Sequence, residues 1–293
     1  MPLVPTASIV DAARAARVGA AAFNVIHLET AEALVTAAER TGIPLILQIS
    51  ENCIHYHGSL LPLTRATLAL AEESTARIAV HLDHITDTEL VHQGITAGVR
   101  SVMVDASALP YDQNVATTAA LAAWCHERGA YVEAELGEVG GKDGVHAPGA
   151  RTDPDEALAF VRATRVDALA VAVGSSHAMR ERTAELDKDL IAELRTTLPV
   201  PLVLHGSSGV PDDELRRAIA AGMTKINIST HLVSVFTGSI RHTLASDPAL
   251  VDSRKYVKPA REAVAQEATR LLEVLNTPVA APDVQTAKAT VRS

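Results

Sequence analysis

The chain has 293 residues, of which 47% are hydrophobic but only 3% are aromatic. This length suits one α/β barrel or two smaller domains, and the composition permits a large core built from Ala, Val, Leu and Ile. The formal net charge is −9, from 35 acidic and 26 basic residues, which argues against nucleic acid as a partner.

Cysteine use and targeting signals indicate the compartment. Two cysteines, Cys53 and Cys125, form no disulfide framework and fit a reducing environment. The first residues lack the charged-then-apolar pattern of a signal peptide, and no apolar run reaches the length of a membrane span. We therefore expect a cytoplasmic protein that binds neither membrane nor nucleic acid.

Short apolar runs alternate along the chain with segments of helical spacing. The predicted strands are Ala20–Val25, Pro44–Ser50, Arg77–Asp83, Ser101–Ala106, Tyr131–Leu136, Ala168–Val173, Pro201–Gly206 and Lys225–Thr230. The predicted helices are Glu29–Arg40, Leu61–Glu73, Thr88–Ala97, Asn114–Arg128, Asp155–Thr164, Leu186–Thr196, Asp212–Ala221, His231–Leu244 and Lys258–Leu275.

The order of these elements predicts the fold class. Eight strand–helix repeats favour an α/β protein with a single (β/α)8 TIM barrel, and the last helix is additional to the barrel. An open doubly wound sheet is the alternative, but the first turn lacks the glycine-rich sequence typical of it. We expect one barrel domain over residues 1–276 and a loose tail over residues 277–293.

Three histidines stand at or just past the ends of predicted strands. His84, His177 and His205 follow strands three, six and seven, so a barrel would bring their rings to one mouth. Three imidazoles there would bind zinc and leave one position open for substrate, although each ring alone could be a structural, hydrogen-bonded residue. Asp83 precedes His84 and could serve as proton donor and acceptor, or could orient a histidine.

Small and hydroxyl residues follow strands seven and eight. A phosphate site needs exposed backbone N–H groups and hydroxyl donors, although ordinary turns favour the same residues. The candidate phosphate-binding residues are Gly206, Ser207, Ser208, Asn227, Ser229 and Thr230. Asn24 and Ser50, at the ends of strands one and two, complete the polar rim as substrate-binding candidates.

Two loops have open interpretations. The segment 137–151 contains five glycines and is long enough to be a lid, or else a surface excursion without a role. His55 and His57 form a His-x-His pair past strand two, for which substrate specificity or a plain exposed loop is expected.

Seven sequence motifs carry a resemblance to a known family. They are AFNV at 22–25, HLDH at 81–84, GVRSVMVDAS at 98–107, VEAELGEVGG at 132–141, PLVLHGSSG at 201–209, KINIST at 225–230 and SRKYVKPAREA at 253–263. As a set they resemble the class II (zinc-dependent) ketose-bisphosphate aldolases, over about residues 1–275, and are most similar to the tagatose-bisphosphate aldolase branch.

The resemblance implies a role for individual residues. Zinc would bind to His84, His177 and His205, and Asp83 would handle the proton of the hydroxyl at the cleaved bond. Asp105 and Glu135 would support the metal or hold a second or monovalent cation. The phosphate of dihydroxyacetone phosphate would be surrounded by Gly206, Ser208, Asn227, Thr230 and Ala178. Arg254 would reach the distal substrate phosphate in a neighbouring subunit, which implies a homodimer or homotetramer.

Two positions differ from the family pattern. Asp143 stands where the family's lid loop carries the glutamate that shuttles a proton on the triose carbon, and Ala178 replaces a glycine after the second zinc histidine. Together with Ser50-Glu51-Asn52 and the two loop histidines, these differences suggest an altered substrate.

The predicted function is that of a zinc-dependent aldolase. It would reversibly cleave a ketose 1,6-bisphosphate of fructose or tagatose type, or a ketose 1-phosphate, to dihydroxyacetone phosphate and an aldehyde. Two alternatives use the same barrel: a metal-dependent hydrolase, and a catalytically silent phosphosugar-binding protein.

Overall fold

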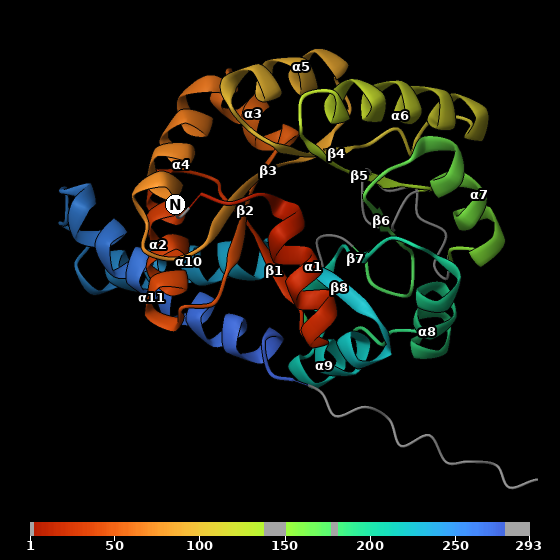
Figure 1. Cartoon of the computed structure of the whole chain (residues 1–293). Coiled ribbons are helices and arrows are strands. Elements are labelled where there is room, and N and C mark those ends of the chain that lie inside the picture. The colour runs from red at the N-terminus through yellow and green to blue at the C-terminus, as the bar shows by residue number, and fades with distance from the viewer. Residues whose placement is uncertain (1–2, 138–150, 177–180, 279–293) are drawn as a thin grey trace, which may run out of the picture.

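The computed structural model describes residues 3–137, 151–176 and 181–278. Eight parallel strands close into one barrel, each paired with its neighbours in chain order and the last with the first (Figure 1). The strands are β1 (Ala20–Asn24), β2 (Leu45–Ser50), β3 (Ile78–Ile85), β4 (Ser101–Val104), β5 (Tyr131–Glu135), β6 (Ala168–Ala170), β7 (Leu202–Leu204) and β8 (Met223–Ile228). The TIM-barrel prediction is confirmed.

Helices surround the barrel and connect its strands (Figure 1). They are α1 (Thr6–Ala16), α2 (Leu28–Thr41), α3 (Glu51–His57), α4 (Leu61–Glu73), α5 (Thr88–Ala97), α6 (Tyr111–His126), α7 (Pro154–Thr164), α8 (Lys188–Thr197), α9 (Asp212–Ala221), α10 (Thr230–Ser246) and α11 (Ser253–Leu275), with a short 3-10 turn, η1, at Ser207–Gly209. No helix in this part of the chain combines the length and the apolar character needed to cross a membrane.

Side-chain alternation sorts each strand into an outer and an inner face. On β2, Leu45, Leu47 and Ile49 belong to the large core under the helices, whereas Ile46 belongs to a separate cluster inside the barrel. Both faces are therefore covered, which explains why the strands are almost continuously apolar in sequence.

Helix α1, which was not predicted, fills one end of the barrel. Its residues Ile9 and Val10 pack with small and branched inward side chains from the first three strands. Those side chains are Ala20, Ala22, Ile46 and Ala79. Because alanine leaves space at this end, an apolar helix is needed to close it.

The middle of the barrel interior is polar. Four polar side chains have no exposed surface there, although most of their strand neighbours are apolar. They are Gln48, His81, Glu133 and Lys225. Burial of ionisable groups is costly unless they pair, so we expect these side chains to contact one another. They form a polar layer next to the apolar end of the barrel.

Several element boundaries differ from the predictions. β6 and β7 end at Ala170 and Leu204, because the chain leaves the ladder at the mouth and continues as turns. β8 begins at Met223, two residues before the predicted start, and α11 begins at Ser253 rather than Lys258. The segment after β2, where a loop was one expectation, forms helix α3.

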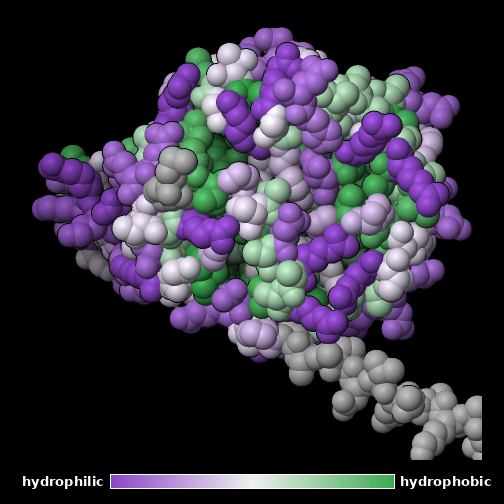
Figure 2. Space-filling model, in the orientation of Figure 1, coloured by the Kyte–Doolittle hydropathy of each residue, from purple (hydrophilic) through white to green (hydrophobic). Residues whose placement is uncertain are grey.

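Helix α10 is weakly packed for its length. Of its residues, Leu232 alone is buried, and Val233 and Leu244 are more than a third exposed. The end of α10 and the start of α11 project beyond the ring of helices (Figure 1). On the face shown in Figure 2, hydrophilic side chains cover most of the outer surface and hydrophobic ones show mainly between the helices.

Candidate metal centre and active site

The end of β3 departs from regular strand geometry and so turns His84 into the mouth. Strict alternation would send His84 to the same side as Leu82, away from Asp83. His84 instead has a left-handed φ of 52°, and the register between β3 and β4 shifts between Leu82 and Ile85. The irregularity re-aims the histidine, as bulges beside active sites commonly do.

His84 is oriented by a carboxylate from β4's end. Its Nδ1 lies 2.7 Å from Oδ2 of Asp105, and Asp105 Oδ1 accepts a hydrogen bond of 2.6 Å from the Ser107 hydroxyl. The His84 ring faces that of His205, with ring centroids 4.6 Å apart. Asp105 therefore fixes the orientation of the His84 ring from its Nδ1 side.

His205 is fully buried between two carboxylates of β5. Its Nε2 lies 2.9 Å from Oε1 of Glu133, and its Nδ1 lies 3.1 Å from Oε2 of Glu135. Burial alone would lower the pKa of His205, but the hydrogen bonds and negative charges of Glu133 and Glu135 outweigh it and raise the pKa to about 10. Without a metal, this arrangement holds a proton where a cation could bind.

The donor set fits a zinc ion. His84, Glu135 and His205 each offer a ligand atom, and these atoms lie within 4.8 Å of one another. Two imidazoles and a carboxylate on three different strand ends are ligands that zinc accepts, and each histidine has a carboxylate partner of the kind that orients zinc ligands. His177, the third predicted ligand, lies outside the described residues, as do Ala178 and Asp143.

Asp83 is buried and faces the interior beside these residues. Its Oδ2 accepts a 2.9 Å hydrogen bond from Nδ2 of Asn24, whose Oδ1 in turn accepts from Gln48. The other oxygen, Oδ1, has no hydrogen-bond partner among the described residues. Burial raises the pKa of Asp83, but the charges of His84, Lys225, His205 and His81 outweigh it, so the pKa lies below its usual value.

The loop after β7 forms a tight turn against the loop after β6. Gly206 has a φ of +68°, and a Cβ built on it would lie 2.5 Å from the backbone oxygen of Ser176. The Ser175 hydroxyl donates a 2.6 Å hydrogen bond to the backbone oxygen of His205. Glycine is required here because both the backbone conformation and the approach of Ser176 exclude a side chain.

The start of α10 presents backbone donors at the mouth. The N–H groups of Ser229 and His231 each donate to the Ser208 hydroxyl at 3.2 Å. The Oδ1 atom of Asn227 is buried without a hydrogen-bond partner in this part of the chain. Helix N-terminal N–H groups beside a hydroxyl suit an anion, and Thr230 begins the helix there.

Some predicted site residues have other partners. The Ser207 hydroxyl donates to the backbone oxygen of Leu204, and Ser50 Oγ accepts from the Cys53 N–H as the N-cap of α3. Arg254 has an 89% exposed side chain that pairs with Asp252, outside the described mouth. Of the loop histidines, His57 contacts the backbone oxygen of Ile26, and His55 lies 3.4 Å from Glu51.

Four buried residues beneath the mouth are not among the predicted site residues. They are Gln48, His81, Glu133 and Lys225. The signal was present, because Glu133 stands two positions before Glu135 and His81 two before Asp83, so alternation puts each pair on one face. Glu51 was also assigned to a substrate-related segment, but its carboxylate accepts hydrogen bonds from Thr86 and Asp87 and ties α3 to the end of β3.

The fold and the mouth define a TIM-barrel enzyme site with residues that could hold a metal ion. Comparison with known proteins identifies its family. Residues 4–278 match the family described as class-II fructose-bisphosphate aldolase. The chain is similar to a fructose-bisphosphate aldolase from Geobacillus stearothermophilus, with 37% identity over 90% of this chain and 93% of that protein. It is also similar to a probable fructose-bisphosphate aldolase from Bacillus subtilis, with 39% identity over 90% and 94% of the two chains.

Solved structures agree with this assignment. The crystal structure of the YdjI aldolase from Escherichia coli K12 superposes with a TM-score of 0.83 at 29% identity, covering 94% of this chain and 98% of that one. This chain therefore belongs to the class II fructose-bisphosphate aldolase family. The family is zinc-dependent and its members are carbon–carbon lyases.

Replacing Gly206 with alanine tests the turn at the mouth. A left-handed alanine costs about 1–2 kcal/mol, and the approach of Ser176 adds to that cost, so we expect G206A to lower the free energy of unfolding by at least about 2 kcal/mol. The matched control is G42A, because Gly42 has the same φ of +68° with nothing within 4 Å of a built Cβ. Urea unfolding measures both, and equal losses would contradict the role given to Ser176.

The proton held by His205 predicts a pH dependence in protein stripped of metal. Because its folded pKa of about 10 lies above the unfolded value of 6.5, its stabilisation is complete below pH 6.5 and is lost as pH rises toward 10. Between about pH 7 and 8.5, the free energy of unfolding should fall with a slope of up to about 1.4 kcal/mol per pH unit.

The measurement is urea unfolding across that range, and zinc-loaded protein is the control, because a metal on His205 replaces the proton and removes the slope. Higher pH is avoided since burial raises the thiol pKa of Cys53 and Cys125 to about 11, which adds a second loss. A constant or rising stability in the metal-free protein would contradict the assignment.

Proposed function

We propose that this chain reversibly cleaves a ketose 1,6-bisphosphate of fructose or tagatose type, or a ketose 1-phosphate, to dihydroxyacetone phosphate and an aldehyde, with one catalytic zinc ion. The observation that carries the proposal is the convergence of His84, Glu135 and His205 beside the buried Asp83, in a chain of the aldolase family. Membership of the aldolase family favours aldol cleavage over the two alternatives, a metal-dependent hydrolase and a catalytically silent phosphosugar-binding protein.

The metal ligands in this proposal are His84, His177 and His205, with Glu135 as a further or alternative ligand and Asp105 as the residue that orients His84. The contact between Ser176 and Gly206 supports this set, since it brings the chain that precedes His177 against the chain that follows His205. A zinc ion there would supply Lewis-acid stabilisation of the negative charge that develops on the triose phosphate oxygen.

Asp83 is the proposed acid and base. Its lowered pKa keeps the carboxylate ionised near neutral pH, ready to accept the proton of the hydroxyl at the bond that breaks. Asn24 holds one carboxylate oxygen, and the other has no partner among the described residues, which leaves it for substrate. In the reverse direction the same group returns the proton to the new hydroxyl. Asp143 stays a candidate for the proton on the triose carbon.

The phosphate of the triose is proposed to bind at the N-terminus of α10. In the described structure the Ser208 hydroxyl accepts from the Ser229 and His231 N–H groups. A phosphate oxygen is a stronger acceptor for these two donors, so Ser208 would turn from acceptor to donor as the ligand arrives. Gly206, Ser207, Asn227, Thr230 and Ala178 complete the proposed site, with Ser50 on the side of the aldehyde.

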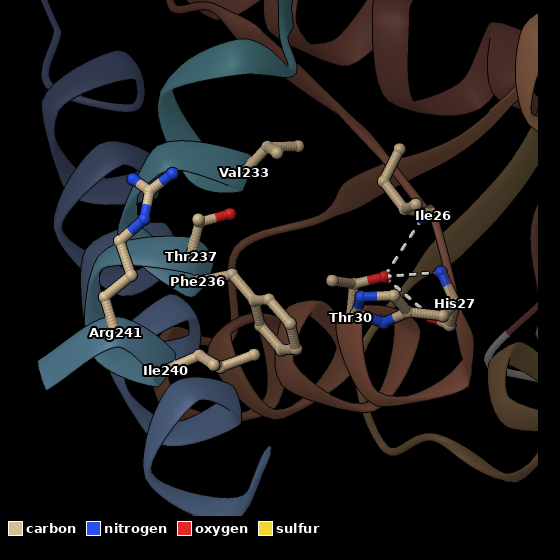
Figure 3. Close-up of a pocket in the computed structure, with 8 residues that line it drawn as sticks. All are labelled: Ile26, His27, Thr30, Val233, Phe236, Thr237, Ile240 and Arg241. Atoms are coloured by element: carbon tan, nitrogen blue, oxygen red, sulfur yellow. Dashed lines mark hydrogen bonds between the residues drawn. The ribbon is translucent and has the colours of Figure 1, made fainter. Parts of the chain in front are cut away.

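We also propose a homo-oligomer in which Arg254 completes the site of a second copy. Arg254 lies at the start of α11, next to the exposed Val251 and the weakly packed α10. An apolar groove also separates α10 from the turn after β1, where the Phe236 and His27 rings lie 4.6 Å apart (Figure 3). Exposed apolar side chains on a projecting arm fit a contact between copies. Cytoplasmic location and the domain limits at residues 1–276 stay predictions.

The experiment for the activity is a coupled assay for triose phosphate with fructose and tagatose bisphosphates, before and after chelation of the metal. We expect chelation to abolish release and added zinc to restore it. Asp83→Asn should lower kcat by about 10²–10⁴-fold without changing the zinc content.

Asp87→Asn is the matched control, because Asp87 lies outside the barrel as the N-cap of α5 and asparagine caps equally well. Product release that persists after complete removal of zinc would refute the proposal, and so would full activity of D83N.

Mixed oligomers test the contribution of Arg254. R254A and D83N should each be inactive alone, whereas co-expressed and purified mixed oligomers should regain part of the activity, since one site then has both residues. Co-expression of two differently tagged D83N copies is the control. Mixed oligomers without activity, or a monomer in sedimentation, would contradict this part of the proposal.

A further inference from the structure

The interior of the barrel contains a fully buried lysine that the proposed chemistry does not use. Lys225 lies on β8 with no exposed side-chain surface, and its Nζ is 2.8 Å from Oε2 of Glu133 across the barrel on β5. Neither atom has a well-aligned hydrogen bond, so the contact is an ion pair. A buried ammonium is costly, and a role is expected for it.

Glu133 bridges this lysine and the metal centre. Its Oε2 faces Lys225, and its Oε1 lies 2.9 Å from Nε2 of His205. His81 approaches Oε2 more distantly, at 3.9 Å, while its Nδ1 contacts the Ser101 hydroxyl at 2.6 Å. Each oxygen of the Glu133 carboxylate thus has its own nearest partner, and all of these side chains except Ser101 are wholly buried.

We propose that Lys225 is a positioning residue: its ammonium holds one oxygen of Glu133 so that the other accepts the Nε2 proton of His205, which leaves Nδ1 of His205 for the metal. The inference rests on the proposed zinc site. A carboxylate that accepts from one imidazole nitrogen fixes the tautomer and direction of the ring, and so makes the second nitrogen a better ligand.

The geometry at the second nitrogen agrees with this role. Nδ1 of His205 lies 3.1 Å from Glu135, which belongs with His205 and His84 to the set of converging ligand atoms. Without the ammonium, the Glu133 carboxylate can rotate toward His81, and the ring of His205 loses its fixed direction. Lys225 therefore acts on the metal through two intervening side chains.

The alternative is that Lys225 only fills space and balances charge in the core. The two roles differ in what they change: a filler affects stability alone, whereas a positioning residue affects zinc affinity by way of Glu133. The difference can be read from zinc binding without any measurement of aldolase activity.

The experiment is a double-variant cycle with Lys225→Met and Glu133→Gln, in which zinc alone is the probe. The dissociation constant is measured by competition with a chromophoric chelator, and the visible spectrum of the cobalt-substituted protein reports the ligand geometry. We expect K225M to weaken zinc binding by about 10–100-fold, as loss of an orienting partner does, and to change the cobalt spectrum. In the E133Q background, K225M should change zinc affinity by less than about threefold.

Lys188→Met is the matched control, because Lys188 pairs with Glu214 at 2.7 Å outside the barrel. It should lower thermal stability and leave zinc affinity and the cobalt spectrum unchanged. If K225M alone leaves too costly a charge on Glu133 to fold, the K225M/E133Q protein, which has no unpaired charge, is compared with E133Q.

Unchanged zinc affinity in folded K225M would overturn the inference, and so would a further loss of affinity when K225M is added to E133Q. These outcomes differ from failure of the proposed zinc site, which would appear as absence of zinc binding by the unmodified protein, and from failure of the proposed activity, which the triose phosphate assay detects. Near-equal affinities of the double variant and E133Q support the inference when E133Q itself, and K225M where it folds, bind zinc more weakly than the unmodified protein.

Discussion

The arrangement of His205 between Glu133 and Glu135 is the interaction on which the site depends. Two carboxylates on alternate positions of β5 face the same buried imidazole, which is unfavourable unless positive charge lies between or beside them. A proton on His205 and the ammonium of Lys225 supply that charge within the described structure. A divalent cation bound at the mouth would meet the same electrostatic demand in place of the proton.

This charge is tolerable because the barrel separates two kinds of interior. At one end, α1 packs Ile9 and Val10 against alanines and Ile46. At the other end, the inward positions of the strands are polar and approach the mouth. The mouth end holds strained groups and buried polar atoms without a partner among the described residues, as binding sites commonly do. His84, with its left-handed φ, and the turn at Gly206 are two strained features of the mouth end.

Much of this could be predicted from the sequence, for a physical reason. Strand–helix alternation and continuous apolar runs favour a parallel barrel. Closure of the barrel brings the strand ends together, so the histidines at the ends of β3 and β7 are expected to meet. Helix α1 was missed, because the space it fills is created by alanines on several strands and is invisible in any one segment. The direction of the His84 side chain could not be predicted from strand alternation either, because it depends on a register shift between β3 and β4.

The interior layer was missed for a different reason. In the sequence, nothing distinguishes Glu133, His81 and Lys225 from other residues of their strands. Only the folded barrel shows that they converge and that their charges compensate one another. Alternation predicts which face a residue occupies, but pairing between β5 and β8, which are not neighbours in the sheet, requires the closed structure. A buried charged residue on a strand of a predicted barrel is therefore best interpreted together with the other inward charges at the same depth. Their sum, rather than each residue's own motif, decides whether a lysine is a reactive amine or a counterion.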